Sequence, residues 1–186
     1  MSDVCRAIMS HYQRIWHGPC LRRQWLHGSI GDLPQDFCVL EFAPSASRNR
    51  WTYATCGMSY STNTIEGGLE LHLFSPRQDE CLVELLTVVA HYHLTGSSLA
   101  LGHTVNFGRP WLPGSICDKG LISLPYLDGP CLENLQCGSR PVRCLWLVPI
   151  TGAEVEYAKK HGLDALETKF ELASVDYADP MRASLI

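Results

Sequence analysis

Residues 69–96 read LELHLFSPRQDECLVELLTVVAHYHLTG, and this stretch predicts a strand followed directly by a helix. Leu69, Leu71 and Leu73 alternate with the polar residues Glu70 and His72. Alternation with a period of two is typical of a strand with one buried face. The first six residues therefore predict the clearest strand of the chain.

The second part of the stretch predicts a helix over residues 76–94. Ser75 can cap the helix, Pro76 suits its first position, and Gln78 completes a capping box. Gly96 follows as a helix stop. The side chains that fall at helical spacing on one apolar face are Leu82, Leu85, Leu86, Val89 and His93.

The residues before this stretch predict one helix and two more strands. An amphipathic helix is expected over 2–17, and strands are expected over 37–43 and 51–56. The segments 44–50 and 57–68 are rich in turn-forming residues, so successive antiparallel pairing of these strands is expected.

The residues after the stretch predict three strands, over 103–107, 121–124 and 143–150. The last is apolar on both faces, as in a central strand that is covered on both sides. Thr151 and Glu154 form a second capping box at the start of a helix that Gly162 ends. A final helix is expected to follow, with its apolar side chains at Leu163, Leu166 and Phe170.

Together these elements predict an α+β fold, with a mixed, mainly antiparallel sheet flanked by helices. The 186 residues suit one domain, with an N-terminal helix and connector over 1–36. Hydrophobic residues make up 46% of the chain and charged residues 18%, which excludes a disordered chain.

Charge and cysteine usage limit the partners and the compartment. The net charge of −4 argues against nucleic acid as the main partner. No run of apolar residues is long enough to span a membrane, and the charged N-terminus lacks the apolar core of a signal peptide. The nine cysteines include no C-x-x-C pair, so we expect free, mostly buried thiols and a cytoplasmic location.

The search for catalytic or metal-binding motifs gives little. His91 and His93 lie two positions apart on the predicted helix and point roughly 200° away from each other, so they are not expected to share a metal ion. There is no nucleophile elbow, phosphate-binding glycine loop or zinc-protease motif. No cysteine and histidine lie in a local sequence context that would expose and activate a thiolate. We therefore expect no metal, no cofactor and no enzymatic activity.

The stretch 102–118, GHTVNFGRPWLPGSICD, is the strongest candidate for a binding loop, because Arg109 and Trp111 lie in it among glycines and prolines. Trp111 has two interpretations, an interface anchor or a side chain that fills the core, and the sequence leaves both open. The segment 125–130 adds an aromatic ring and a carboxylate. The candidate partner-binding residues are His103, Asn106, Arg109, Trp111, Tyr126 and Asp128.

Two other hypotheses stand beside protein binding. One is an enzyme or small-ligand-binding protein with a pocket around residues 103–111, in which Asn106 and Arg109 beside His103 orient an anion. The other is a homodimeric scaffold. Convergence of the three side chains on one pocket would favour the first of these hypotheses.

Several longer runs are similar to one known family. They are ELLTVVAHYH (84–93), GHTVNFGRPWLPGS (102–115), LISLPY (121–126), WLVPIT (146–151), HGLDAL (161–166) and DYADP (176–180), followed by Arg182 and Ser184. In this order they resemble the suppressor-of-fused family. The resemblance extends over about 37–186 and is more specific from Leu69 onward.

The resemblance implies an α+β domain that binds proteins without catalysing a reaction. Animal members restrain a transcription factor and carry a second domain, whereas this chain ends at Ile186, so we expect the stand-alone bacterial type. For such a domain the resemblance implies an immunity protein that neutralises a polymorphic toxin. The family supplies no catalytic residues.

Overall fold

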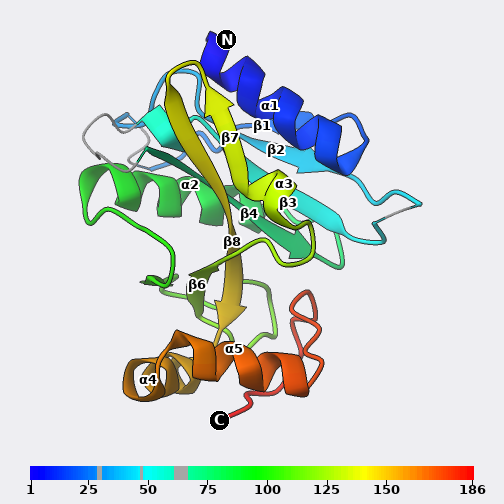
Figure 1. The fold of residues 1–186 in the computed structure, drawn as a ribbon, viewed down its shortest axis with the longest axis vertical. Coiled ribbons are helices and arrows are strands. Elements are labelled where there is room, and N and C mark those ends of the chain that lie inside the picture. The colour runs from blue at the N-terminus through cyan, green and yellow to red at the C-terminus, as the bar shows by residue number, and fades with distance from the viewer. Residues whose placement is uncertain (29–30, 47, 61–66) are drawn as a thin grey trace.

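The computed structural model describes residues 1–28, 31–46, 48–60 and 67–186, which form an eight-stranded mixed sheet with helices on both faces (Figure 1). The α+β prediction is therefore confirmed. The strand order is β1-β2-β3-β4-β8-β6-β5, and β7 also pairs with β8. The strands are β1 (Leu21–Arg23), β2 (Cys38–Phe42), β3 (Trp51–Cys56), β4 (Gly68–Ser75), β5 (Thr104–Asn106), β6 (Lys119–Ser123), β7 (Asn134–Cys137) and β8 (Arg140–Ile150).

The helices lie around this sheet, with α1 at one end of the molecule and α4 and α5 at the other, near the C-terminus (Figure 1). They are α1 (Asp3–Trp16), the 3-10 turn η1 (Met58–Tyr60), α2 (Cys81–Thr95), α3 (Pro130–Glu133), α4 (Gly152–His161) and α5 (Leu163–Leu172).

The longest strand, β8, lies between β4 and β6 and is buried on both faces from Cys144 onward. This confirms the central strand that the sequence predicts. Its pairing with β4 is parallel, with Leu71 opposite Leu145 and His72 opposite Trp146. The other strand pairings of the described residues are antiparallel. Among them, β2 with β3 and β3 with β4 are the successive antiparallel pairings that the sequence predicts. The expected turns over 44–50 and 57–68 fall partly outside the described residues.

Alternate residues of the strands build the core on opposite faces. On one face, Leu71 and Leu73 pack with the apolar stripe of α2. On the other face, Leu40 and Ala54 pack with α1, whose buried side chains include Tyr12 and Trp16. A third cluster forms beyond α1 on that second face, where α5 covers β6 and β8. The N-terminal helix is therefore part of the domain's core.

The predicted start of α2 is wrong by five residues. Ser75 remains the last residue of β4, and its hydroxyl donates to the carbonyl of Arg77 instead of capping a helix. The helix begins at Cys81, where the side chain of Asp79 accepts the Cys81 N–H at 3.1 Å. Residues 76–80 are needed to turn the chain from the sheet onto its face, so the capping-box pattern was misleading here.

The cysteines follow the prediction in part. Those at 5, 38, 56, 117 and 144 are buried free thiols, and three others are half-buried. Cys131 is exposed at the start of α3, a short helix that the sequence analysis did not predict. In the described residues, no helix is long and apolar enough to cross a membrane.

Candidate functional site

A groove of about 710 Å³ follows β5 between α2 and α4. Val88 and Tyr92 stand on the outer side of α2 and are 54% and 43% exposed, although both are large apolar side chains. Val105 and Phe107 come from the β5 segment, and Val155 of α4 completes the lining. The groove therefore exposes apolar side chains, chiefly Val88 and Tyr92, beside the end of the sheet.

The backbone of β5 adds hydrogen-bonding groups to this groove. Phe107 donates its N–H to the carbonyl of Asp118 at 3.0 Å. The backbone groups of Phe107 therefore point toward β6. In an antiparallel pair of strands, the residues whose backbone groups point toward the partner strand alternate with residues whose groups point away. The next residue of β5 that points toward β6 is therefore Val105. The backbone N–H and C=O groups of Thr104 and Asn106 therefore point away from β6. Since β5 is the last strand in the sheet order of the described residues, this edge is open.

The charged side chains around the groove are already paired with one another. Arg109, in the loop after β5, forms an ion pair with Glu84 of α2. Lys119 contacts Asp118 at 2.6 Å and also donates to the side-chain oxygen of Asn106 at 3.2 Å. The groove thus offers apolar surface and backbone groups, and its charges compensate each other.

The six candidate residues are divided among several places. Asn106 and Arg109 line the groove, whereas His103 is exposed beside a different hollow, next to His93 and Leu145. The proposed anion-binding set of His103, Asn106 and Arg109 therefore does not meet in one pocket, and Arg109 is held by Glu84.

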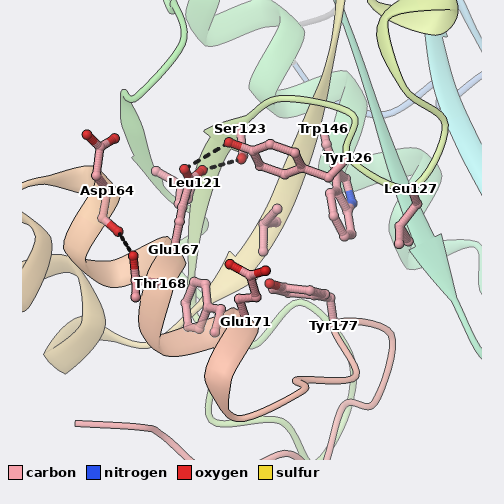
Figure 2. A pocket seen from close by; sticks show the side chains of 12 residues that line it. Leu121, Ser123, Tyr126, Leu127, Trp146, Asp164, Glu167, Thr168, Glu171 and Tyr177 are labelled. Atoms are coloured by element: carbon pink, nitrogen blue, oxygen red, sulfur yellow. Dashed lines mark hydrogen bonds between the residues drawn. The ribbon is translucent and has the colours of Figure 1, made fainter.

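Tyr126 and Asp128 lie on the other face of the sheet. The Tyr126 hydroxyl donates to Glu167 of α5 at 2.9 Å, at the edge of a separate pocket (Figure 2). Asp128 accepts the indole N–H of Trp16 at 3.1 Å and forms an ion pair with Arg48. Its side chain is largely buried, so Asp128 fastens α1 to the loop after β6.

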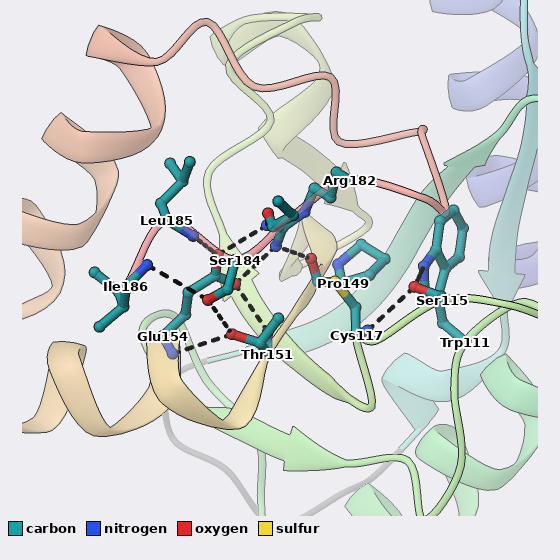
Figure 3. Close-up of polar contacts among 11 residues, drawn as sticks. Trp111, Ser115, Cys117, Pro149, Thr151, Glu154, Arg182, Ser184, Leu185 and Ile186 are labelled. Carbon is teal, nitrogen blue, oxygen red and sulfur yellow. Dashed lines mark hydrogen bonds and ion pairs between the residues drawn. The ribbon is translucent and has the colours of Figure 1, made fainter.

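Trp111 is 2% exposed and packs in the core under α2. Its indole N–H donates to the hydroxyl of Ser115 at 3.0 Å, and this hydroxyl also accepts the N–H of Cys117 at 3.1 Å (Figure 3). Of the two interpretations that the sequence left open, the geometry is that of the core-filling side chain. The ring supports the loop that carries Arg109.

A buried ion pair between Arg182 and Glu154 fastens the C-terminal segment to the start of α4. The guanidinium donates to both Glu154 oxygens, at 2.8 and 2.7 Å, and to the carbonyl of Pro149 at 2.9 Å (Figure 3). Burial alone would raise the pKa of Glu154, but the Arg182 charge and the N–H groups of Thr151 and Leu185 lower it overall. The capping box at Thr151 is present as predicted.

The two histidines of α2 have different environments. His91 lies 3.2 Å from a carboxylate oxygen of Asp32 at the surface. His93 is buried and accepts the N–H of Leu99 at 2.9 Å, and burial lowers its pKa. Among the described residues, no group of three or more His, Cys, Asp or Glu side chains is arranged to hold a metal ion.

Sequence reasoning missed the α2 and α4 walls of the groove. A signal was available at Val88 and Tyr92, which are four residues apart on α2 and lie off its apolar stripe. Side chains at this spacing are neighbours on a helix surface, so an apolar pair outside the buried stripe indicates an exposed apolar patch.

Together, the fold and the groove define a single-domain α+β protein with an open sheet edge. The model of the family described as suppressor of fused protein (SUFU) matches residues 34–183. A comparison with curated protein sequences gives no match. The chain belongs to the suppressor of fused family.

Solved structures agree with this assignment. A SUFU homolog from Neisseria gonorrhoeae is 34% identical, with a TM-score of 0.85, and the match covers 99% of this chain and 97% of that one. A chain of the Sufu–Fu complex is 14% identical, with a TM-score of 0.69 and 98% coverage of each chain. Drosophila Suppressor of Fused is 15% identical, with a TM-score of 0.70, and the match covers 98% of this chain and 51% of that chain.

Proposed function

We propose that this chain is a non-enzymatic protein-binding domain that takes up an extended segment of its partner along β5. The observation that carries the proposal is the outward-facing backbone of Thr104 and Asn106 beside exposed Val88 and Tyr92. An extended peptide can add a strand to such an edge, with its alternate side chains placed in the groove. That a chain of this fold occurs in a Sufu–Fu complex supports the same class of function.

The paired charges around the groove also favour this function. Because Arg109 and Lys119 are compensated by Glu84 and Asp118, a partner segment meets little net charge there. Recognition would then depend on backbone hydrogen bonds and apolar side chains. Arg109, at the mouth of the groove, can exchange part of its pairing with Glu84 for a partner carboxylate.

The test compares the tagged chain with two aspartate variants in its native cells. Val88→Asp places a charge in the groove, while Ile116→Asp changes an equally exposed apolar residue, 57% exposed, outside it. We expect a co-purifying protein to be retained by the wild type and by Ile116→Asp and to be reduced about tenfold or more by Val88→Asp. Equal retention by Val88→Asp, or no co-purifying protein at all, would contradict the proposal.

In its sharper form, the proposed partner is a protein toxin and the chain is its immunity protein. Two points support this form: the resemblance to bacterial family members and the 34% identity to a bacterial homolog. The test is growth of cells that express the captured partner with and without this chain. We expect growth to be restored by the wild type and not by Val88→Asp, whereas a partner that is harmless when expressed alone would exclude the immunity role.

A further inference from the structure

A second hollow, of about 530 Å³, lies on the face of the sheet opposite α2, beneath α5. Its floor is formed by buried side chains of β6 and β8, and its walls by α5, the loop after β6 and Tyr177 (Figure 2). This volume is in the usual range for pockets that hold a ligand, about 300–1,000 Å³. The pocket is separate from the β5 groove.

Three carboxylates of α5 line this pocket, and no lysine, arginine or histidine does. Asp164, Glu167 and Glu171 recur at intervals of three and four residues, so they share one side of the helix. Glu167 is held in place by the hydroxyls of Ser123, at 2.6 Å, and Tyr126, at 2.9 Å. Among the described residues, the charged side chains of the lining are therefore all acidic, and the nearby Arg182, which lies over Phe170, is paired with the buried Glu154.

Two basic side chains that contact neighbouring elements are occupied elsewhere. Lys169 of α5 stacks on Tyr157, with its nitrogen 5.1 Å from the ring centre. Arg50 pairs with Asp176 at 3.6 Å and lies over Phe74. The carboxylates Asp164 and Glu171 have no cationic partner among the described residues.

Aromatic rings form the apolar part of the pocket. Trp146 is 2% exposed, and Tyr177 packs against it with the ring centres 4.9 Å apart. The indole N–H of Trp146 has no acceptor among the described residues, although the side chain is buried and lines the pocket. In Figure 2 the indole nitrogen is on the side of the ring toward Leu127, another lining residue. The wall thus offers one unused hydrogen-bond donor together with aromatic faces.

The pKa values of the two tyrosines agree with a negative field. Burial, followed by the hydrogen bond to Glu167 and the charges of Glu167 and Asp164, raises the pKa of Tyr126 to about 12. Burial and the charges of Glu167 and Glu171 raise the pKa of Tyr177, and the charge of Arg182 offsets part of this rise. Both hydroxyls therefore stay neutral at physiological pH.

We propose that this pocket binds the side chain of an arginine or lysine residue presented by a partner protein. The cationic group would lie against Glu167 and Glu171, and its aliphatic stem against Trp146 and Tyr177. Carboxylates supply charge-assisted hydrogen bonds, and aromatic faces attract cations. A backbone carbonyl of the presented segment can accept the Trp146 N–H. The protein source of the side chain rests on the proposed function, whereas the cation chemistry is independent of it.

The test is an NMR titration of the full chain with Nα-acetyl-L-arginine amide, whose blocked ends leave the guanidinium as its only charge. We expect the resonances of the Trp146 indole N–H and of the Glu167 region to shift, and added salt to weaken binding. The citrulline analogue, which is neutral and of nearly equal size, should cause no shift there. Absence of a shift with arginine amide, or equal binding of citrulline amide, would overturn the proposal.

Variants of the pocket carboxylates test whether these groups bind the arginine amide. Glu167→Gln with Glu171→Gln should weaken binding about tenfold or more, because both carboxylates that would make charge-assisted hydrogen bonds to the cation are neutralised. Glu171→Gln alone removes no hydrogen bond within the described residues, so it serves if the double variant folds poorly. Glu80→Gln, a change at an exposed glutamate that pairs with Arg23 far from the pocket, should bind as the wild type does.

A further arm tests the source of the cation. If spermidine binds in the pocket and arginine amide does not, the pocket takes a free amine, and the assignment to a protein side chain is wrong. Because no partner protein is used in these titrations, they can succeed or fail independently of the groove experiment.

Discussion

The β5 groove and the pocket beneath α5 belong to the same half of the sheet, but they leave different polar groups unpaired. In the groove, the side-chain charges are paired, as for Arg109 with Glu84, and the backbone of β5 is open. In the pocket, the backbone groups of β6 and β8 are hydrogen-bonded to each other. The lining carboxylates Asp164 and Glu171 have no cationic partner among the described residues. The comparison teaches that one small domain can leave backbone groups unpaired at one surface and carboxylates unpaired at another.

The largest expected effect comes from Arg182→Met, which removes the partner of the buried Glu154 carboxylate. Glu154 is fully buried, so loss of Arg182 leaves a buried carboxylate without its partner. We expect the free energy of unfolding to fall by about 3–5 kcal/mol, measured by urea denaturation. Arg77→Met, at an exposed pair with Asp79, should cost less than about 1 kcal/mol. Similar values for both variants would show that the buried ion pair contributes no more to stability than the exposed one.

Trp111→Ala should damage the groove side of the molecule selectively. Because the ring is buried in the core, we expect a loss of about 3–5 kcal/mol. Trp111→Phe, which keeps most of the volume but loses the hydrogen bond to Ser115, should lose clearly less. Full stability of Trp111→Ala in thermal unfolding, combined with weak partner binding, would instead make Trp111 an interface anchor.

Acid should weaken the ion pair between Glu154 and Arg182. The folded-state pKa of Glu154 lies below its ordinary value of about 4.5, so its contribution to stability is complete above that pH. This contribution is lost as the pH falls from about 4.5 through the folded-state pKa. Stability measured between pH 3 and 6 should therefore decline more steeply in the wild type than in Glu154→Gln. Parallel curves would contradict the role of this residue.

Thr104→Pro should separate binding from folding at the open edge. Its outward N–H takes no part in the ladder with β6, so its loss should cost little stability, while partner affinity falls about tenfold. Val105→Pro is the contrasting change, because this residue pairs inward and its loss should destabilise the sheet. Calorimetric titration with the captured partner measures the first effect. Unchanged affinity of a folded Thr104→Pro variant would remove β5 from the interface.

The smallest effects should have opposite signs in the two sites. Glu84→Gln breaks a pair with Arg109 and should lower stability by about 0.2–1 kcal/mol. Glu171→Gln relieves repulsion from Glu167, four residues earlier on α5, and should raise stability by about 0.2–0.5 kcal/mol. Both changes should shrink at 1 M salt. Stability changes of the same sign would contradict the view that charges are paired in the groove and unpaired in the pocket.

Much of the fold could be predicted from sequence because its main elements carry their own signals. The bounds of β3 agree with the prediction over 51–56, and the doubly apolar run around Trp146 identified the central strand. The strands β1 and β7 and the helix α3 were missed because they are short and half exposed, and are positioned by neighbouring strands or by α1.

The candidate sites were less accessible to sequence reasoning. Asn106 and Arg109 were identified from their loop, but the opposite walls of the groove come from α2 and α4, far away in the chain. For Trp111, composition could not distinguish a buried ring from an exposed one, since both occur among glycines and prolines. The acidic spacing of Asp164, Glu167 and Glu171 was visible, but only the sheet packing shows that it faces aromatic rings.

The parallel pairing of β4 with β8 also has a consequence for biosynthesis. These two strands are neighbours in the centre of the sheet, yet residues 76–139 separate them in the chain. A nascent chain that has been synthesised only to residue 139 contains β4 with one edge unpaired, and strand edges of this kind are prone to aggregate. The centre of the sheet can therefore close only after β8 (Arg140–Ile150) has been synthesised and has left the ribosome.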